Sequence, residues 1–138
     1  MMTRIDARDR LIVALDVPSA AEADALVARM GDQVRFVKVG LELYTVAGPD
    51  IVRKLVDRGK RVFLDLKFLD IEETVRRATA RVAAMGATFL TVHANRKALI
   101  AAVQGRGSSD LKLLAVTVLT NFDGEDLREM GNQRNVQD

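Results

Sequence analysis

Apolar residues recur along the chain in five short runs, separated by longer segments with a different spacing. The runs are rich in β-branched residues and occupy residues 11–15, 34–39, 61–66, 88–93 and 111–119. Between them, residues 20–30, 49–59 and 72–86 place apolar side chains three or four positions apart, as amphipathic helices do. Strands that alternate with helices predict βα units joined into a parallel sheet.

Residues at the ends of the helical segments support these boundaries. Ser19 stands three positions before Glu22, the spacing of a capping box at a helix start. Gly31, Gly59 and Gly86 stand where the three helical segments end, as C-terminal capping glycines do.

Unexpected polar residues appear at the C-terminal end of nearly every apolar run. They are Asp16, Lys38, Asp65 with Lys67, His93 and Thr120. The carboxyl ends of the strands form the active-site face of a βα barrel, whereas an open doubly wound sheet binds ligands mainly at one switch point. We therefore predict an α/β fold of the (β/α)8 TIM-barrel type, of which this chain carries about the first five strands and four helices.

The last residues break the pattern. Residues 132–138, NQRNVQD, contain one apolar residue and no hydrophobic period. We expect a partial βα-barrel domain over residues 1–131, followed by an unstructured or non-family tail. Because a complete barrel has eight strands, the chain is expected either to be a fragment or to receive its other strands from another chain.

The amino-acid composition limits the classes of protein to which this chain can belong. With 138 residues, 49% of them hydrophobic, the chain is long enough for one globular domain with a core. Its 21 basic and 19 acidic residues are spread evenly, which does not indicate a nucleic-acid partner. The absence of cysteine excludes disulfides and thiolate-bound metals. Without a signal peptide or a long apolar run, we expect a soluble, cytoplasmic protein that does not contact membranes.

The run FLDLKFLDI, residues 63–71, carries charges where a core strand would exclude them. Alternate side chains of a strand share a face, so Asp65 and Lys67 should point together into the barrel. Lys38 and Asp16 should reach the same rim from neighbouring strands, which predicts an array of alternating charge. A single pair would be read as a structural ion pair, but four such residues on three strand ends favour a functional site.

FLDLKFLDI resembles the Asp-x-Lys-x-x-Asp signature of the orotidine 5′-phosphate decarboxylase family. The resemblance extends from about residue 10 to 131, through LIVALDVPS at 11–19, VKVGLELY at 37–44, AGPDIVRKL at 47–55, GATFLTVHA at 86–94 and LLAVTVLTNFDGEDL at 113–127. It implies a lyase that decarboxylates orotidine monophosphate to uridine monophosphate in pyrimidine biosynthesis, with no metal and no organic cofactor.

The resemblance also implies a role for individual residues. Lys38, Asp65 and Lys67 would form the catalytic array of one subunit, and Asp70 would complete the array of its neighbour in a homodimer or higher homo-oligomer. The residues that would bind the nucleotide substrate are Asp16 at the ribose, Thr74 at the partner's ribose and Thr120 beside the pyrimidine.

The sequence departs from the family pattern near these residues. Leu69 stands where family members usually carry His, while Glu72, Glu73 and Asn121 replace residues of other types. The phosphate-binding Gln and Arg of the family lie on loops after later strands, which these 138 residues do not include. We therefore do not expect this length of chain alone to be an efficient enzyme.

Two alternatives remain open. One is a sugar-phosphate decarboxylase or aldolase of the same suprafamily, which would use magnesium; the other is an inactive partial barrel that assembles as an oligomer.

For His93 we expect a structural hydrogen bond at the barrel rim rather than catalysis. For Arg76, Arg77 and Arg81 we expect the solvated face of a helix rather than a basic patch.

Overall fold

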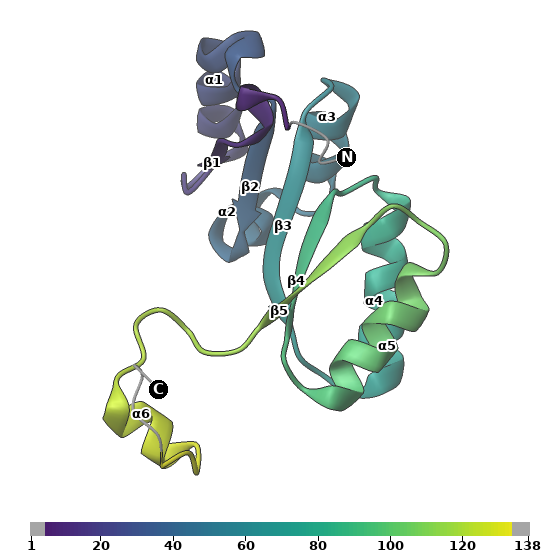
Figure 1. Cartoon of the computed structure of the whole chain (residues 1–138). Coiled ribbons are helices and arrows are strands. Elements are labelled where there is room, and N and C mark those ends of the chain that lie inside the picture. The colour runs from purple at the N-terminus through teal and green to yellow at the C-terminus, as the bar shows by residue number, and fades with distance from the viewer. Residues whose placement is uncertain (1–4, 134–138) are drawn as a thin grey trace.

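The structure is a computed structural model that describes residues 5–133, built around a five-stranded parallel sheet (Figure 1). The strands are β1 (Ile12–Ala14), β2 (Phe36–Gly40), β3 (Arg61–Phe68), β4 (Phe89–His93) and β5 (Lys112–Val116). The helices are α1 (Ala20–Met30), α2 (Leu41–Ala47), α3 (Asp50–Asp57), α4 (Glu72–Ala84), α5 (Arg96–Arg106) and α6 (Gly124–Glu129), with the 3-10 turns η1 (Ala7–Asp9) and η2 (Gly31–Gln33). Each apolar run thus corresponds to a strand, although β2 extends one residue and β3 two residues past the end of its run.

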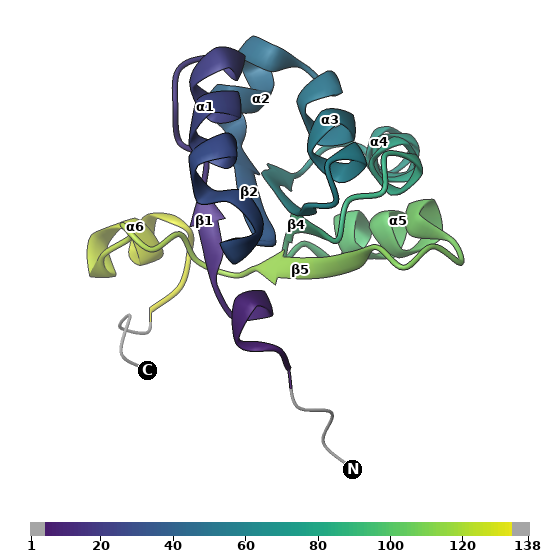
Figure 2. The same ribbon diagram turned by 90° about the horizontal axis from the view of Figure 1, so that it is seen from above.

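The strand order identifies the type of α/β fold. Each strand pairs in parallel with the next strand of the chain, in the order β1-β2-β3-β4-β5. A doubly wound sheet reverses its order at a switch point, whereas a barrel adds its strands in one direction. Helices α1 to α5 all lie on one face of the curved sheet (Figure 2). The chain has the architecture of part of a TIM-type barrel, as predicted.

Alternation along the strands sends apolar side chains into the layer between sheet and helices. Val37 of β2, Leu64 of β3 and Leu90 of β4 are fully buried members of this core. The residues that alternate with these buried ones along each strand face the inner side of the sheet, where the rings of Phe36 and Phe89 stack with centroids 5.3 Å apart. The strands are therefore anchored on one face, and their other face carries the polar residues of the rim.

The helix boundaries agree with the expected capping residues. The Ser19 hydroxyl accepts a hydrogen bond from the backbone N–H of Glu22 at 3.2 Å. Gly31, Gly59 and Gly86 all adopt positive φ at or just after the ends of α1, α3 and α4. Within residues 5–133, no helix combines the length and the apolar character needed to cross a membrane.

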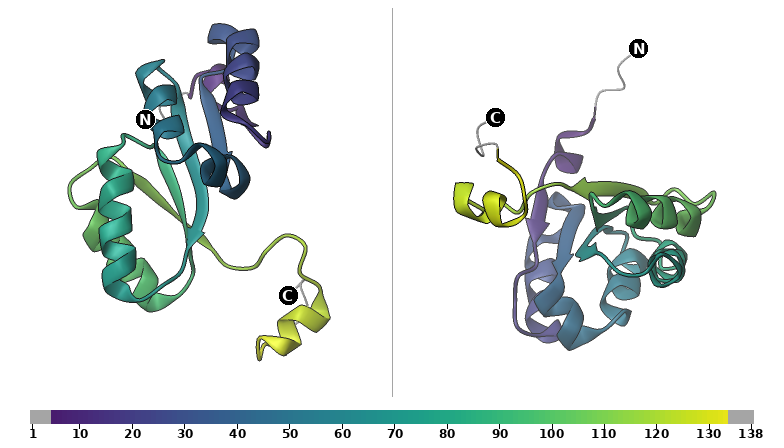
Figure 3. Two further views of the ribbon diagram at one scale, coloured as in Figure 1. Left: turned by 180° about the vertical axis from the view of Figure 1, so that it is seen from behind. Right: turned by 90° about the horizontal axis from the view of Figure 1, so that it is seen from below.

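The structure differs from the sequence pattern in its number of helices, since residues 5–133 contain six α-helices where about four were expected, and in the stretches around α2 and β5. Residues 41–47 form α2 directly after β2, and Gly48, at φ 66°, separates it from α3. The fifth strand stops at Val116 instead of reaching residue 119, because its partner strand β4 ends at His93, which pairs with Val116. From there the chain runs away from the sheet to α6 (Figure 3). Of the expected tail, residues 134–138 lie outside the described residues.

Helices α4 and α5 pack closely because α5 has a glycine where the two backbones meet. A Cβ atom at Gly105 would lie 2.2 Å from the carbonyl oxygen of Arg76 and 3.0 Å from Cβ of Thr79. Ala101 and Ala102 of α5 are also buried. The contact therefore has no room for even a methyl group at position 105.

We predict that Gly105→Ala destabilises the fold. Alanine favours a helix over glycine by about 1 kcal/mol, but relieving the clash with the α4 backbone should reverse this into a net loss of about 1–3 kcal/mol. Urea unfolding followed by far-UV circular dichroism measures the change. Val103→Ala, at an exposed position of the same helix, serves as control and should change stability by less than about 0.5 kcal/mol. A stabilised Gly105→Ala variant would contradict the close packing.

Candidate active site

The carboxyl ends of β1, β2 and β3 bring four charged side chains into one line. The ammonium group of Lys38 lies 3.4 Å from Oδ1 of Asp16 and 3.8 Å from Oδ2 of Asp65. The ammonium group of Lys67 lies 2.9 Å from Oδ1 of Asp65. The charges therefore alternate in the order Asp16, Lys38, Asp65, Lys67. We call this line the charged array; the strand pattern predicted that these four side chains would meet.

Asp65 is the most enclosed member of the charged array. Its side chain is 16% exposed, compared with 24% for Lys38 and 32% for Lys67. Burial raises the pKa of Asp65, but hydrogen bonds from Lys67 and Thr91 and the charges of Lys67 and Lys38 outweigh it and leave the pKa below its ordinary value. Asp65 is therefore ionised at neutral pH and lies between two cations.

Strand β3 is irregular at Lys67, the residue whose ammonium group pairs with Asp65. The register between β3 and β4 shifts between Leu64 and Phe68, and Lys67 adopts φ 50°, in the left-handed region. The hydroxyl of Thr91 on β4 accepts a hydrogen bond from the backbone N–H of Lys67 at 3.0 Å and donates one to Oδ1 of Asp65 at 2.8 Å. The sequence reading missed Thr91, although it stands in an apolar run two positions before His93.

Gly40 keeps space open beside the charged array. Its φ of −96° is accessible to any residue, so conformation does not require glycine there. A Cβ atom at this position would lie 3.5 Å from Oδ1 of Asp16 and 3.6 Å from Nζ of Lys38. Any longer side chain would extend into the space that these two charged groups face.

Asp70 and Thr74 lie outside the charged array of their own chain. Together with Leu69 they line a hollow of about 270 Å³ between the end of β3 and α4. The Asp70 carboxylate accepts a hydrogen bond from the backbone N–H of Ile71 at 2.6 Å, and it forms no ion pair with any residue from 5 to 133. Leu69 is 57% exposed at the same place. The structure thus separates Asp70 from Asp65 and Lys67.

The two unusual glutamates after Asp70 have partners of their own. Glu72 pairs with Lys97 of α5 at 3.1 Å. Glu73 pairs with Arg76 at 2.7 Å and with Arg77 at 2.6 Å, and hydrogen bonds from these arginines lower its pKa to about 2. Both glutamates also lie in the first turn of α4, where the helix dipole favours negative charge. Their charges are balanced locally.

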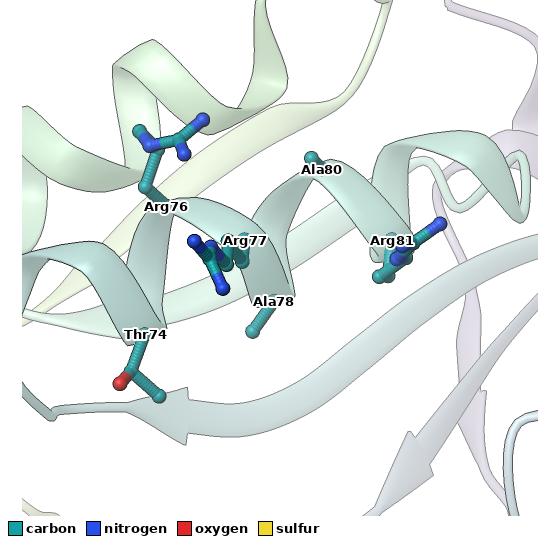
Figure 4. A pocket seen from close by; sticks show the side chains of 6 residues that line it. All are labelled: Thr74, Arg76, Arg77, Ala78, Ala80 and Arg81. Atoms are coloured by element: carbon teal, nitrogen blue, oxygen red, sulfur yellow. The ribbon is translucent and has the colours of Figure 1, made fainter.

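A second hollow, of about 480 Å³, lies on the outside of α4 (Figure 4). It is lined by Thr74, Arg76, Arg77, Ala78, Ala80 and Arg81. Figure 4 shows the three guanidinium groups pointing in different directions rather than converging on one point. Arg77 is 74% exposed. These observations agree with the expectation that the three arginines lie on the solvated face of a helix.

The remaining rim residues do not join the charged array. Thr120 lies in a turn after β5, in the segment that leads away from the sheet to α6 (Figure 1). The expected structural hydrogen bond of His93 is not formed within residues 5–133, where its side chain has no hydrogen-bond partner; the residue that pairs with it on β5 is the apolar Val116. Among residues 5–133, no group of three Asp, Glu or His side chains is arranged so that it could bind a metal ion.

A family model described as "Orotidine 5'-phosphate decarboxylase / HUMPS family" matches residues 9–138. The chain belongs to this family. The orotidine 5′-phosphate decarboxylase of Nitrobacter winogradskyi is 53% identical over 132 residues, which make up 96% of this chain and 55% of that protein. That of Rhodopseudomonas palustris strain BisA53 is 49% identical over 138 residues, 100% of this chain and 59% of that protein.

Solved structures of similar proteins agree with the fold. The orotidine 5′-phosphate decarboxylase of Lactobacillus acidophilus matches with a TM-score of 0.80 at 40% identity, over 88% of this chain and 58% of that one. An uncharacterized conserved protein from Geobacillus kaustophilus matches with a TM-score of 0.83 at 39% identity, over 91% of this chain and 62% of that one. The chain thus spans somewhat more than half the length of these similar proteins.

We predict that Lys67→Met raises the pKa of Asp65. The substitution removes a hydrogen bond and a positive charge while the burial of the carboxylate remains. In the unsubstituted chain the folded-state pKa lies below the unfolded value, so ionised Asp65 stabilises the fold above about pH 4 and this contribution is lost as the pH falls through the folded pKa. The variant should therefore lose less stability on acidification.

Carboxyl ¹³C NMR titration of Asp65, together with unfolding between about pH 6 and pH 3, measures both effects. Lys54→Met is the matched control, because Lys54 pairs with Asp24, whose other partner Arg58 remains. It should leave the Asp65 titration unchanged. An unchanged Asp65 pKa in Lys67→Met would show that Lys67 does not stabilise the carboxylate.

Proposed function

We propose that this chain carries the catalytic array of an orotidine 5′-phosphate decarboxylase, a lyase that converts orotidine monophosphate to uridine monophosphate. The observation that carries the proposal is the alternating line Asp16, Lys38, Asp65, Lys67 at the carboxyl edge of a barrel-type sheet. Relatives at about 50% identity bear this name. The pathway served would be pyrimidine biosynthesis, in the cytoplasm.

The charges suit the proposed reaction. When the bond between C6 of the pyrimidine and its carboxylate breaks, the electron pair stays on C6 and forms a carbanion without an adjacent electron sink. An ammonium group such as that of Lys67 stabilises this anion and then supplies the proton that replaces CO2. The carboxylate of Asp65, 2.9 Å from the ammonium group of Lys67, holds that group in place for the transfer. No organic cofactor and no metal take part in this scheme.

We further propose that the complete site needs more chain than these residues. Asp70 and Thr74, which lie outside the array of their own chain, would serve the site of a second copy in a homodimer. The remaining strands of the barrel would supply the phosphate-binding groups and cover the inner face of the sheet. Ile12 on β1 and Leu114 on β5 are 39% and 38% exposed there, which supports such a cover. Asp16 and Thr120 would contact the ribose and the pyrimidine.

We expect the chain alone to decarboxylate orotidine 5′-phosphate slowly or not at all. A protein that joins residues 1–131 to the remaining part of the Nitrobacter relative should restore the reaction, because it supplies the missing phosphate contacts. In the joined protein, Lys67→Ala should lower kcat by about 10³-fold or more. Loss of absorbance on conversion of orotidine to uridine monophosphate measures the rate.

Lys54→Ala, on the helical face of the fold, is the control and should keep the full rate. A joined protein that folds and binds uridine monophosphate but does not decarboxylate, or one whose rate survives Lys67→Ala, would refute the proposal. Magnesium-dependent turnover of a hexulose 6-phosphate or a keto-gulonate 6-phosphate would instead assign the sugar-phosphate branch, which the matching family description also includes.

The shared site predicts complementation between two inactive variants. Lys67→Ala damages the site to which it belongs, whereas Asp70→Ala damages the site of the partner. A hybrid dimer therefore carries both lesions in one site and none in the other. Refolding the two inactive joined variants together at equal amounts should restore about a quarter of the unsubstituted rate. No recovery, with hybrid dimers present by mass spectrometry, would place Asp70 in its own subunit's site.

A further inference from the structure

Strand β3 contains two more residues than β4 at the level of the charged array. Leu64 pairs with Leu90, and the next pair is Phe68 with Val92. Residues 65–67 therefore lie opposite one residue of β4, Thr91. In a regular ladder, Lys67 would instead lie opposite His93, two residues closer to the carboxyl end of β4. The bulge thus keeps Lys67 at the level of Asp65.

The bulge leaves the backbone of Lys67 in need of support. The residue adopts φ 50°, which side-chain-bearing residues avoid, and it is the non-glycine residue with positive φ among residues 5–133. The register shift also removes its regular partner in the ladder, so its N–H needs another acceptor. The hydroxyl of Thr91 is that acceptor, at 3.0 Å.

Thr91 joins the backbone and the side chain of the catalytic pair into one closed cycle. Its oxygen accepts from the Lys67 N–H, and its proton goes to Oδ1 of Asp65 at 2.8 Å. The same carboxylate oxygen accepts from Nζ of Lys67 at 2.9 Å, which closes the cycle. The Thr91 side chain is buried, with 5% of the residue exposed. A hydroxyl has one proton and two lone pairs, so both of its roles here are compatible.

We propose that Thr91 is a positioning residue, whose hydroxyl holds the bulge of β3 and thereby fixes the distance between Lys67 and Asp65. The importance of this positioning for decarboxylation depends on the function proposed above. The positioning of Lys67 and Asp65 itself does not depend on that function. Valine has nearly the same shape and lacks the hydroxyl, whereas serine keeps the hydroxyl and loses only a methyl group. The two substitutions therefore separate packing from hydrogen bonding.

The test uses the full chain, labelled for NMR and carrying Thr91→Val or Thr91→Ser. In Thr91→Val, the Asp65 carboxyl should titrate at a higher pH, because burial persists and one donor is lost. The backbone amide of Lys67 should exchange with solvent at least about tenfold faster. Thr91→Ser should restore both observables toward those of the unsubstituted chain.

Thr79→Val is the matched control, because Thr79 is a second buried threonine and its hydroxyl has no hydrogen-bond partner among the described residues. It should leave the Asp65 titration and the Lys67 exchange unchanged. An unaltered Asp65 titration and Lys67 exchange rate in folded Thr91→Val would overturn the proposal. If Thr91→Val does not fold, failure of Thr91→Ser to keep both observables would overturn it equally. Absence of decarboxylation by the folded joined protein would refute the proposed function without affecting this result.

Discussion

The carboxylate of Asp65 is the group on which the geometry of the site depends. It lies between the ammonium groups of Lys38 and Lys67, and without it two cations would face each other across the rim. At an effective dielectric constant of about 20, two unit charges about 4 Å apart interact by roughly 4 kcal/mol, and partial exposure lowers this figure. Removing the anion would replace two attractions of this order with a repulsion, so the carboxylate of Asp65 holds the two ammonium groups close together at the rim.

The sheet places these charges at one level because its strands are parallel and consecutive. Ala14 pairs with Lys38, and Gly40 pairs with Asp65, so the ends of β1, β2 and β3 come within reach of one another. The apolar residues that alternate with them, such as Val39 and Leu64, are fully buried against the helices. The core and the site are thus two faces of the same strands, and a one-residue slip of β3 would exchange them.

The sequence was sufficient for the presence and order of the strands, the helix caps and the meeting of the four charges, because each depends on a period or a spacing. It was not sufficient for the bulge. Lys67 has no glycine to mark its positive φ, and Thr91 is a residue type common in ordinary strands. The end of β5 was also misplaced, since it is determined by where β4 ends rather than by the apolar residues 117–119. Pairing between distant segments, which local patterns do not record, decided all of these features.

The segment after the bulge explains why the residues of one signature lie in two separate places. Lys67 is held beside Asp65, but three residues later the chain has left the sheet and turned toward α4, so the Asp70 carboxylate binds the backbone N–H of Ile71 instead of Lys67. Leu69 lies between them in the sequence, and its side chain is exposed. Basic side chains of α4 and α5 pair with the two glutamates that follow. This leaves Asp70 as the unpaired anion of this turn within residues 5–133. An unpaired carboxylate at an exposed turn costs little in water, because it stays hydrated, and it remains available to a cation of another chain, as the shared active site proposed above requires.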